Sequence, residues 1–243
     1  MDKVRMGLIG AGGIGNLHMS YFEKVEGLEF TAVADIDPDA LQAAVEKYDV
    51  EGFDTGQALI DSGLCDAVLI STPHYDHPVL AQAAMKANLH VLTEKPVAVT
   101  AKAAAETNAL AKRKKKLVYG AMFQMRTSRT WAKVKQLVEE GEIGEMKRMS
   151  WIVTSWFRTQ SYYDSGGWRA TWDGEGGGVL LNQCPHNLDM LCWVCGTPTR
   201  VVAQVALGPV RFGQEQRVLV HLLQPIPILG TGLQAVFFGQ LPH

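Results

Sequence analysis

Short apolar runs alternate with amphipathic, helix-prone stretches through the first half of the chain. The apolar runs predict five β-strands, at Val4–Ile9, Leu28–Ala34, Ala67–Ile70, His90–Thr93 and Leu117–Ala121. Helices are predicted between them, up to about Val25 and at Tyr75–Ala87 and Ala101–Lys115. Another helix begins at Asp37-Pro38-Asp39, which supplies an N-cap, a proline for the first helical position and an acid near the helix dipole. Repeated βα units of this kind require a parallel sheet with right-handed crossovers.

The pattern changes after about Phe123. The second half predicts a helix at Ser128–Glu140, a long strand at Met146–Phe157, a helix at Leu188–Val194 and a strand at Arg200–Leu207. A polar, aromatic and glycine-rich stretch separates the long strand from the later helix. We therefore predict an α/β chain, with a doubly wound parallel sheet in residues 1–122 and a partial α+β domain with an open mixed sheet in residues 123–243.

Composition and charge exclude several classes of protein. The 243 residues are 47% hydrophobic, and a chain of this size can bury a core without disulfides or metals. Lys and Arg number 23 against 25 Asp and Glu, so no basic field indicates a nucleic-acid partner. Four cysteines and a start without signal-peptide order favour a reduced, cytoplasmic protein. Prolines and glycines interrupt the uncharged segment Val218–His243, so we expect no membrane-spanning helix.

The first predicted strand leads into a glycine-rich turn, Gly10-Ala11-Gly12-Gly13-Ile14-Gly15. Such glycines permit a tight turn and a close approach of a pyrophosphate to backbone N–H groups at a helix start. The next strand ends before Asp35, which lies 20 residues beyond Gly15, where a carboxylate can bond a ribose 2′-hydroxyl. This context predicts a Rossmann-type NAD site rather than a plain strand–helix turn. Asp35 would repel a 2′-phosphate, so NAD is favoured over NADP.

Three further segments carry candidate chemistry. They are Ser71-Thr72-Pro73 with His77, Glu94-Lys95-Pro96, and the glycine-rich run from Gly176 that leads to Asn182, His186 and Asp189. The first two follow the ends of predicted parallel strands, where open α/β sheets bind ligands. A lysine or a histidine there can move a proton during an alcohol oxidation. Taken singly, each segment is more typical of plain structure: a proline-containing turn with an exposed histidine, a surface turn, and a capped helix with a buried histidine.

Together and in this order, the motifs resemble the family of glucose–fructose oxidoreductase, inositol dehydrogenase and their relatives. The resemblance spans residues 4 to 207 and includes the turn Gly141-Glu-Ile-Gly144. It implies hydride transfer between NAD and a carbon of a sugar, sugar acid or cyclitol, with Lys95 and His186 as catalytic residues and a cis bond between Lys95 and Pro96. It also implies that full-length members form homo-oligomers.

The resemblance assigns further site residues. Cofactor contacts fall on Gly10, Gly12, Gly13, Ile14, Gly15, Asp35, Ser71, Thr72, Pro73, His77, Glu94 and Lys95. Substrate contacts fall on Asn182, Asp189, Arg126, Tyr162 and Trp168, and Tyr163 and Arg169 could also line a sugar pocket. Many relatives carry Asp where this chain has Asn182, and an amide cannot charge-stabilise a protonated histidine as a carboxylate does. This difference weakens an inositol assignment more than an oxidoreductase one.

Two other functions and two other kinds of site are compatible with parts of the sequence. An NAD-using glycosidase of the same family and a non-catalytic NAD-binding protein remain open. Cys192 and Cys195 have the spacing of a metal or redox pair, but we expect packing residues of a helix and no metal. The basic run Lys112–Lys116 closes a predicted helix, which suits the helix dipole and solvent better than nucleic acid.

The length is short for this family, whose second domain has more strands. The family pattern is expected to fade after Leu207, giving an atypical tail from about residue 208. We predict a truncated or frame-shifted reading of a longer gene, with the change near Gly208–Gln214. The second sheet would then have open edges, and activity of this chain would be doubtful.

Overall fold

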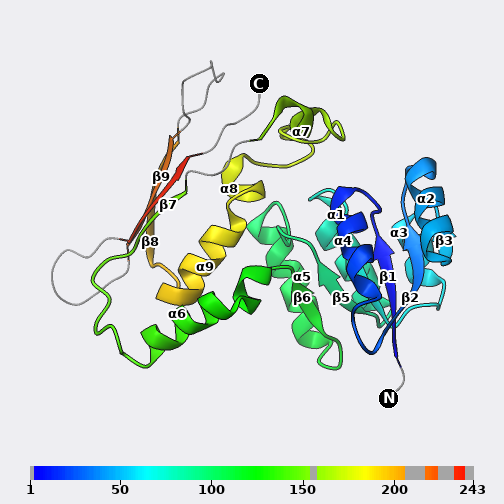
Figure 1. Cartoon of the computed structure of the whole chain (residues 1–243), viewed down its shortest axis with the longest axis horizontal. Helices are drawn as coiled ribbons and strands as arrows, with labels where there is room; N and C mark the ends of the chain where they lie inside the picture. Colours follow the sequence, from blue (N-terminus) through cyan, green and yellow to red (C-terminus); the bar gives the residue numbers. More distant parts are fainter. Residues whose placement is uncertain (1–2, 154–157, 206–216, 224–232, 239–243) are drawn as a thin grey trace. The chain divides into compact units, whose positions relative to one another are not determined.

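The computed structural model describes residues 3–153, 158–205, 217–223 and 233–238 of the chain (Figure 1). The chain divides into two compact units, Met1–Met122 and Phe123–His243, which are described in turn. Among the described residues, no helix combines the length and the apolar character that crossing a membrane requires.

Unit 1 contains one six-stranded sheet with the order β3-β2-β1-β4-β5-β6. Its strands are β1 (Val4–Ile9), β2 (Leu28–Ala34), β3 (Glu51–Phe53), β4 (Ala67–Ile70), β5 (His90–Thr93) and β6 (Tyr119–Ala121). Every neighbouring pair is parallel, which confirms the predicted doubly wound sheet. The short strand β3 was not predicted, and β6 begins two residues later than the sequence indicated.

Five helices alternate with these strands. They are α1 (Gly13–Phe22), α2 (Pro38–Tyr48), α3 (Gly56–Asp61), α4 (Asp76–Lys86) and α5 (Ala101–Arg113). The N-cap of α2 is Asp37, whose carboxylate accepts the N–H groups of Asp39 and Ala40, as the sequence predicted. Thr100 caps α5 in the same way by accepting the N–H of Ala103 at 3.2 Å.

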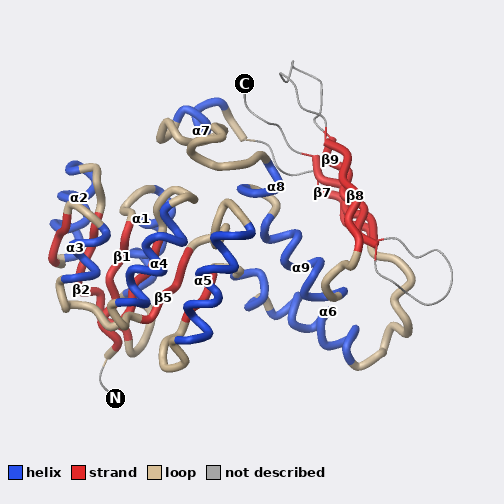
Figure 2. The backbone as a smooth tube through the Cα atoms, turned by 180° about the vertical axis from the view of Figure 1, so that it is seen from behind, coloured by secondary structure: helices blue, strands red, loops and turns tan. Residues whose placement is uncertain are grey.

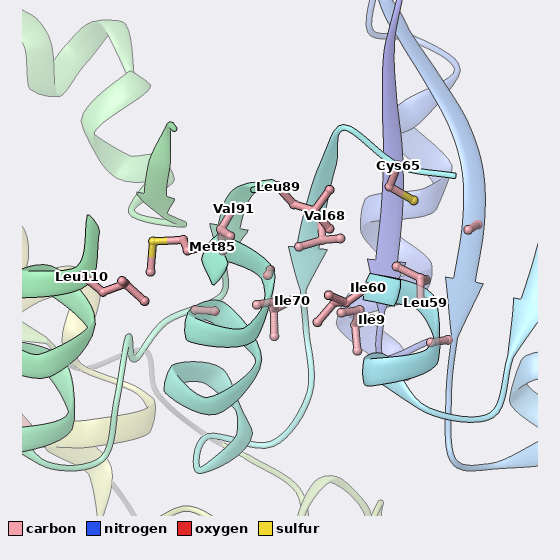
Figure 3. Packing of buried hydrophobic residues seen from close by; sticks show 14 residues of the cluster. Ile9, Leu59, Ile60, Cys65, Val68, Ile70, Met85, Leu89, Val91 and Leu110 are labelled. Atoms are coloured by element: carbon pink, nitrogen blue, oxygen red, sulfur yellow. The ribbon is translucent and has the colours of Figure 1, made fainter. Parts of the chain in front are cut away.

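The core of unit 1 lies on both faces of the sheet. Successive residues of β1 point to opposite faces, so that Leu8 belongs to one buried cluster and Ile9 to the other. Helices α1 and α2 cover the face of Leu8, where Met19, Phe22 and Ala44 are buried. Helices α3, α4 and α5 supply the cluster around Ile9, shown in Figure 3. Burial on both faces explains why the strands appear in the sequence as continuous apolar runs.

Unit 2 contains a four-stranded sheet with the order β7-β10-β9-β8 (Figure 2). Its strands are β7 (Ser150–Val153), β8 (Arg200–Val205), β9 (Arg217–Leu223) and β10 (Leu233–Phe238). Strand β10 pairs parallel with β7 and antiparallel with β9, and β9 pairs antiparallel with β8. This confirms the predicted open mixed sheet. The helices are η1 (Gln124–Thr127), α6 (Arg129–Glu139), α7 (Gln160–Asp164), α8 (Val179–Asn182) and α9 (Pro185–Cys195).

Three expectations for unit 2 need correction. The long strand predicted at Met146–Phe157 is described only as β7, and residues 154–157 lie outside the described ranges. Helix α9 begins at Pro185, earlier than Leu188, because a proline is well suited to the first helical position. Strands β9 and β10 form in the segment for which the sequence predicted no element, and they occupy the two inner positions of the sheet.

Candidate active site

The glycine-rich turn between β1 and α1 has two glycines that the fold itself requires. Gly10 has a φ of +99°, and a Cβ there would lie 2.8 Å from the backbone carbon of Ser71. A Cβ on Gly15 would lie 1.9 Å from the carbonyl oxygen of Gly10. A Cβ atom on Gly12 or on Gly13 would meet nothing within 4 Å. The turn is therefore tightly packed against the protein on one side and open on the side of Gly12 and Gly13.

The start of α1 fits an anionic group. Its N-cap is Gly12, no side chain caps the helix, and its first turn contains no acidic residue. The first N–H groups of a helix have no partner within the helix, and they carry partial positive charge. Ile14, in this first turn, is 42% exposed. The residues present thus suit the pyrophosphate of a dinucleotide.

Asp35 follows β2 and is joined to the same turn. Its Oδ2 accepts the N–H of Ala11 at 2.6 Å, and its Oδ1 accepts the N–H of Asp37 at 2.8 Å. These bonds fix the carboxylate beside the glycine-rich turn and leave it with further lone pairs. It can therefore accept ribose hydroxyl groups while it braces the loop.

The predicted segment after β4 contacts the glycine-rich turn through Ser71. The Ser71 hydroxyl donates to the carbonyl oxygen of Gly10 at 2.7 Å and is buried. His77 is 1% exposed, and its two ring nitrogens lie 2.8 Å from the Thr72 oxygen and 2.7 Å from the Pro96 oxygen. The direct cofactor contact predicted for His77 does not match this placement, because its ring is enclosed. His77 instead joins the loop after β4 to the loop after β5.

The segment Glu94-Lys95-Pro96 follows β5, and the bond between Lys95 and Pro96 is cis, as expected. The Glu94 carboxylate is buried, and its Oε2 accepts the N–H of Lys95 at 3.1 Å. Its Oε1 lies 2.7 Å from Nε2 of His18, a residue of α1 that the sequence did not single out. Lys95 is half-buried.

The surroundings of Glu94 favour its charged form. Burial acts to raise the pKa of Glu94, but the hydrogen bond and charge of His18, with the N–H and charge of Lys95, outweigh it and lower the pKa below its ordinary value. The group beside Lys95 is therefore a carboxylate. Unlike the half-buried Asp35, Glu94 is buried as well as bonded through both of its oxygens, so it is better placed to orient the loop than to bind a cofactor directly.

Arg126 and Asp189, both predicted to bind substrate, contact each other in unit 2. Arg126 Nε donates to Asp189 Oδ2 at 2.8 Å, and Nη2 donates to Oδ1 at 2.5 Å. This hydrogen bond raises the pKa of Arg126 further above its ordinary value, which keeps the guanidinium charged. The ion pair joins η1 to α9, where His186 packs edge-to-face on Phe123 with ring centroids 6.1 Å apart.

Asn182 is bonded to a buried acid that sequence reasoning missed. Its amide Nδ2 donates to Oε1 of Glu175, and both residues are buried. Glu175 lies inside the glycine-rich run that was singled out for its glycines and its histidine. The Asn that replaces the expected Asp is thus accompanied by a carboxylate one hydrogen bond away, which restores an acidic group to this part of unit 2.

Tyr162 is the centre of a polar network. Its hydroxyl accepts from Nε2 of Gln183 at 2.9 Å and from Nη1 of Arg169 at 2.9 Å. The guanidinium groups of Arg169 and Arg158 lie 4.4 and 5.4 Å from its ring centroid. Arg169 also lies 4.8 Å from the ring of Trp168. Arginines therefore occupy part of the aromatic surface that the sequence predicted for a sugar.

The cysteine pair of α9 has the character of packing residues. Burial, with the neighbouring Cys192 thiol, raises the pKa of Cys195 to about 11. Burial also raises the pKa of Cys192. Cys195 Sγ lies 3.0 Å from Met149 Sδ. Across the described ranges, no three His, Cys, Asp or Glu side chains are grouped so that they could hold a metal ion.

Comparison with known families decides what these two units are. Residues 4–121 match the family model described as "Oxidoreductase family, NAD-binding Rossmann fold". Residues 131–225 match the "GFO/IDH/MocA C-terminal domain". The chain belongs to this oxidoreductase family. The match of the second model ends at residue 225, so the family pattern continues beyond Leu207, where it was expected to fade.

Several oxidoreductases resemble the chain. An inositol 2-dehydrogenase of Salmonella typhimurium is 32% identical over 145 residues, which is 58% of this chain and 43% of the relative. A D-glucoside 3-dehydrogenase of Escherichia coli is 31% identical over 205 residues, which is 81% of this chain and 55% of the relative. The WlbA dehydrogenase of Chromobacterium violaceum, solved with NADH and UDP-GlcNAcA, is 30% identical with a TM-score of 0.85, and the match covers 100% of this chain and 68% of that one. The chain spans about half the length of the curated relatives it matches.

Proposed function

We propose that this oxidoreductase binds NAD(H) through unit 1 and transfers a hydride between the nicotinamide and a hydroxyl-bearing carbon of a sugar, sugar acid or cyclitol. The observation that carries the proposal is the turn at Gly12, which is open above the uncapped start of α1, while Asp35 is held at its edge by the N–H of Ala11. Asp35 would repel the 2′-phosphate of NADP, so NAD is the proposed cofactor. The names of the relatives, which include inositol and glucoside dehydrogenases, support the substrate class.

The proposed chemistry moves one proton and one hydride. Bound NAD supplies the hydride acceptor, and in the reverse direction NADH supplies the hydride. The residues of the chain handle the proton of the alcohol O–H, which must leave as the carbon loses its hydride. We assign this proton to Nζ of Lys95 in unit 1, with the imidazole of His186 in unit 2 as the alternative.

The position of the Lys95–Pro96 turn supports the assignment of Lys95. This turn lies at the carboxyl end of β5, which is the edge of a parallel sheet where open α/β folds bind ligands. Glu94 and His77 hold its backbone from two directions. A proton donor on a braced loop is well positioned for transfer, since misplacement of such groups costs rate steeply.

Cofactor binding and turnover test this proposal separately. NADH binding is followed by fluorescence, and NADH formation is followed by near-ultraviolet absorbance over a panel of sugars, sugar acids and cyclitols. Lys95→Ala should bind NADH as wild type does and lose nearly all turnover. The matched control is Lys102→Ala, which removes an exposed lysine from α5.

Other outcomes would replace the proposal with one of its alternatives. If the wild-type chain does not bind NADH, the proposal fails. If it binds NADH but wild type and Lys95→Ala are equally inert, a non-catalytic NAD-binding role is favoured. Release of a glycosidic leaving group without net NADH would indicate an NAD-using glycosidase.

A further inference from the structure

His18 is a buried histidine of α1 that neither the glycine-rich motif nor the proposed chemistry uses. It lies on the inner face of the helix with Gly15, Met19 and Phe22, so its ring is turned towards the sheet. Its Nε2 lies 2.7 Å from Oε1 of Glu94, a residue 76 positions away in the chain. Each of the two side chains is only 11% exposed.

The pair of His18 and Glu94 is connected to Lys95 through the Glu94 carboxylate. Because Glu94 is ionised, it can only accept hydrogen bonds, and Nε2 of His18 must carry the hydrogen between them. The other carboxylate oxygen, Oε2, accepts the N–H of Lys95 at 3.1 Å. One carboxylate therefore links the side chain of a helix residue to the backbone of the lysine.

The loop Glu94-Lys95-Pro96 is also held by contacts at its first and last residues. The N–H of Glu94 donates to the oxygen of Ile70 at 2.8 Å, which extends the pairing of β5 with β4. The ring of His77 lies 2.7 Å from the carbonyl oxygen of Pro96. Among these contacts, the one between His18 and Glu94 connects the Lys95 turn to the helix whose first turn carries Gly13, Ile14 and Gly15.

We propose that His18 is a positioning residue: it orients the Glu94 carboxylate, which in turn sets the backbone of Lys95 relative to the helix that begins at the glycine-rich turn. This inference rests on the proposed function for the role of Lys95 in turnover. It assigns Glu94 to orienting the lysine rather than to contacting the cofactor. A buried hydrogen-bonded pair that served folding alone would have no specific effect at Lys95, and this difference can be measured.

The first test needs no substrate. His18→Leu removes the donor, and His18→Gln keeps an N–H donor. Amide hydrogen exchange of Lys95 should become about tenfold faster in His18→Leu, because Glu94 no longer holds that N–H, and should return towards wild type in His18→Gln. The amide of Glu94 is the internal reference, since it bonds to Ile70 and should keep its protection.

A matched control separates a local effect from general destabilisation. Asp66→Asn breaks the ion pair of Arg5 and Asp66, whose atoms lie 2.7 Å apart at the amino ends of β1 and β4. It should leave the exchange of the Lys95 amide unchanged relative to the Glu94 amide. If His18→Leu also leaves Lys95 protection unchanged, or speeds both amides equally, the positioning role is wrong.

The second test uses turnover. His18→Leu should lower kcat by about tenfold to a hundredfold and change its pH profile, while KM and NADH affinity change little. His18→Gln should recover most of kcat, and the double variant His18→Leu with Glu94→Gln should be no slower than the slower single variant. Wild-type kcat in His18→Leu would overturn the inference, whereas failure of wild type to bind NADH would overturn the proposed function and leave the exchange test valid.

Discussion

At the scale of single residues, Asp35 shows how one side chain serves both the fold and the proposed cofactor site. Its two carboxylate oxygens accept the N–H groups of Ala11 and Asp37, so its position relative to the glycine-rich turn is fixed. Its remaining lone pairs suit the two hydroxyls of an adenosine ribose. The negative charge also discriminates against a phosphate at the same position.

Replacement of Asp35 therefore predicts a change in cofactor preference. Asp35→Asn should weaken NADH binding by about tenfold or more, since a hydrogen bond to a charged group is lost. Binding of NADPH should weaken less or improve, because the repulsion is removed. Fluorescence titrations with both cofactors measure this. Asp39→Asn removes an exposed charge from the first turn of α2 and should leave the ratio of the two affinities unchanged.

Alanine substitutions at two glycines of the turn should have different effects, one on stability and the other on NADH binding. Gly15→Ala should lower the thermal stability of the ligand-free chain, because its Cβ would lie 1.9 Å from the oxygen of Gly10. Gly12→Ala should leave that stability unchanged, because its Cβ meets nothing within 4 Å, and should weaken NADH binding. Thermal unfolding with and without NADH distinguishes them. Equal loss of stability in both variants would contradict the assignment of the open side of the turn.

Glu94 predicts a dependence of stability on pH. Its folded pKa lies below its ordinary value, so its contribution is fully present above the pKa of the unfolded carboxyl and is lost as pH falls through the lower folded pKa. Urea unfolding between about pH 3 and pH 7 should show this loss in wild type. Glu94→Gln should be less stable at neutral pH, and the difference from wild type should shrink on acidification. A difference that is constant with pH would contradict an ionised Glu94.

The residues that the sequence predicted well are those whose chemistry is local. Gly10, Gly15 and Asp35 belong to one βαβ unit, so their positions around one turn follow from spacing alone. His18 could not be found in this way, because its partner Glu94 is 76 residues distant. Glu175 is only seven residues from Asn182, but no pattern in a glycine-rich run indicates that an acid is buried there.

At the scale of elements, the same division between local and distant interactions holds. The apolar runs of unit 1 predicted five of its six strands, because the four inner strands β2, β1, β4 and β5 supply residues to the clusters on both faces of the sheet. In unit 2, β9 and β10 were missed. Strand β10 pairs with β7, which lies far earlier in the chain, so its place in the sheet does not follow from a local pattern, whereas β9 pairs with its sequence neighbours β8 and β10.

Helix α9 carries His186 and is tied to η1 by one ion pair. Asp189→Asn should lower the free energy of unfolding by about 1 kcal/mol, because the bidentate bond to Arg126 is lost but the arginine is 46% exposed. Arg126→Gln should cost a similar amount, and the double variant should cost little more than either. Chemical unfolding measures these differences.

A weaker ion pair on α6 is the control for this prediction. Nζ of Lys135 lies 3.0 Å from Oε1 of Glu139, which is one helical turn later, and the Glu139 side chain is 62% exposed. Glu139→Gln should cost only a few tenths of a kcal/mol. If Asp189→Asn costs no more than this control but raises KM, Asp189 acts on substrate, as its place in the sequence motif implied, rather than on the helix.

At the scale of the whole molecule, the family assignment and the proposed activity rest on different observations. The two family models together match most of the chain, and the order of strands in unit 1 is that of a doubly wound sheet. The sequence does not identify the substrate. In the structure, several of the residues expected to line its pocket are bonded to one another. Arg126 pairs with Asp189, and Tyr162 with Arg169. A truncated gene, a cytoplasmic location and a homo-oligomer of the full-length form stay predictions.

If a hydride passes between a substrate carbon and the nicotinamide on this chain, isotope labelling of the substrate will follow it. A sugar or cyclitol found in the substrate screen is labelled with deuterium at its carbinol carbons and incubated with NAD and the chain. Deuterium is expected at C4 of the nicotinamide with wild type, and far less over the same time with Lys95→Ala. NADH binding by the wild type, but no deuterium at C4 for any substrate of the panel, would contradict this transfer.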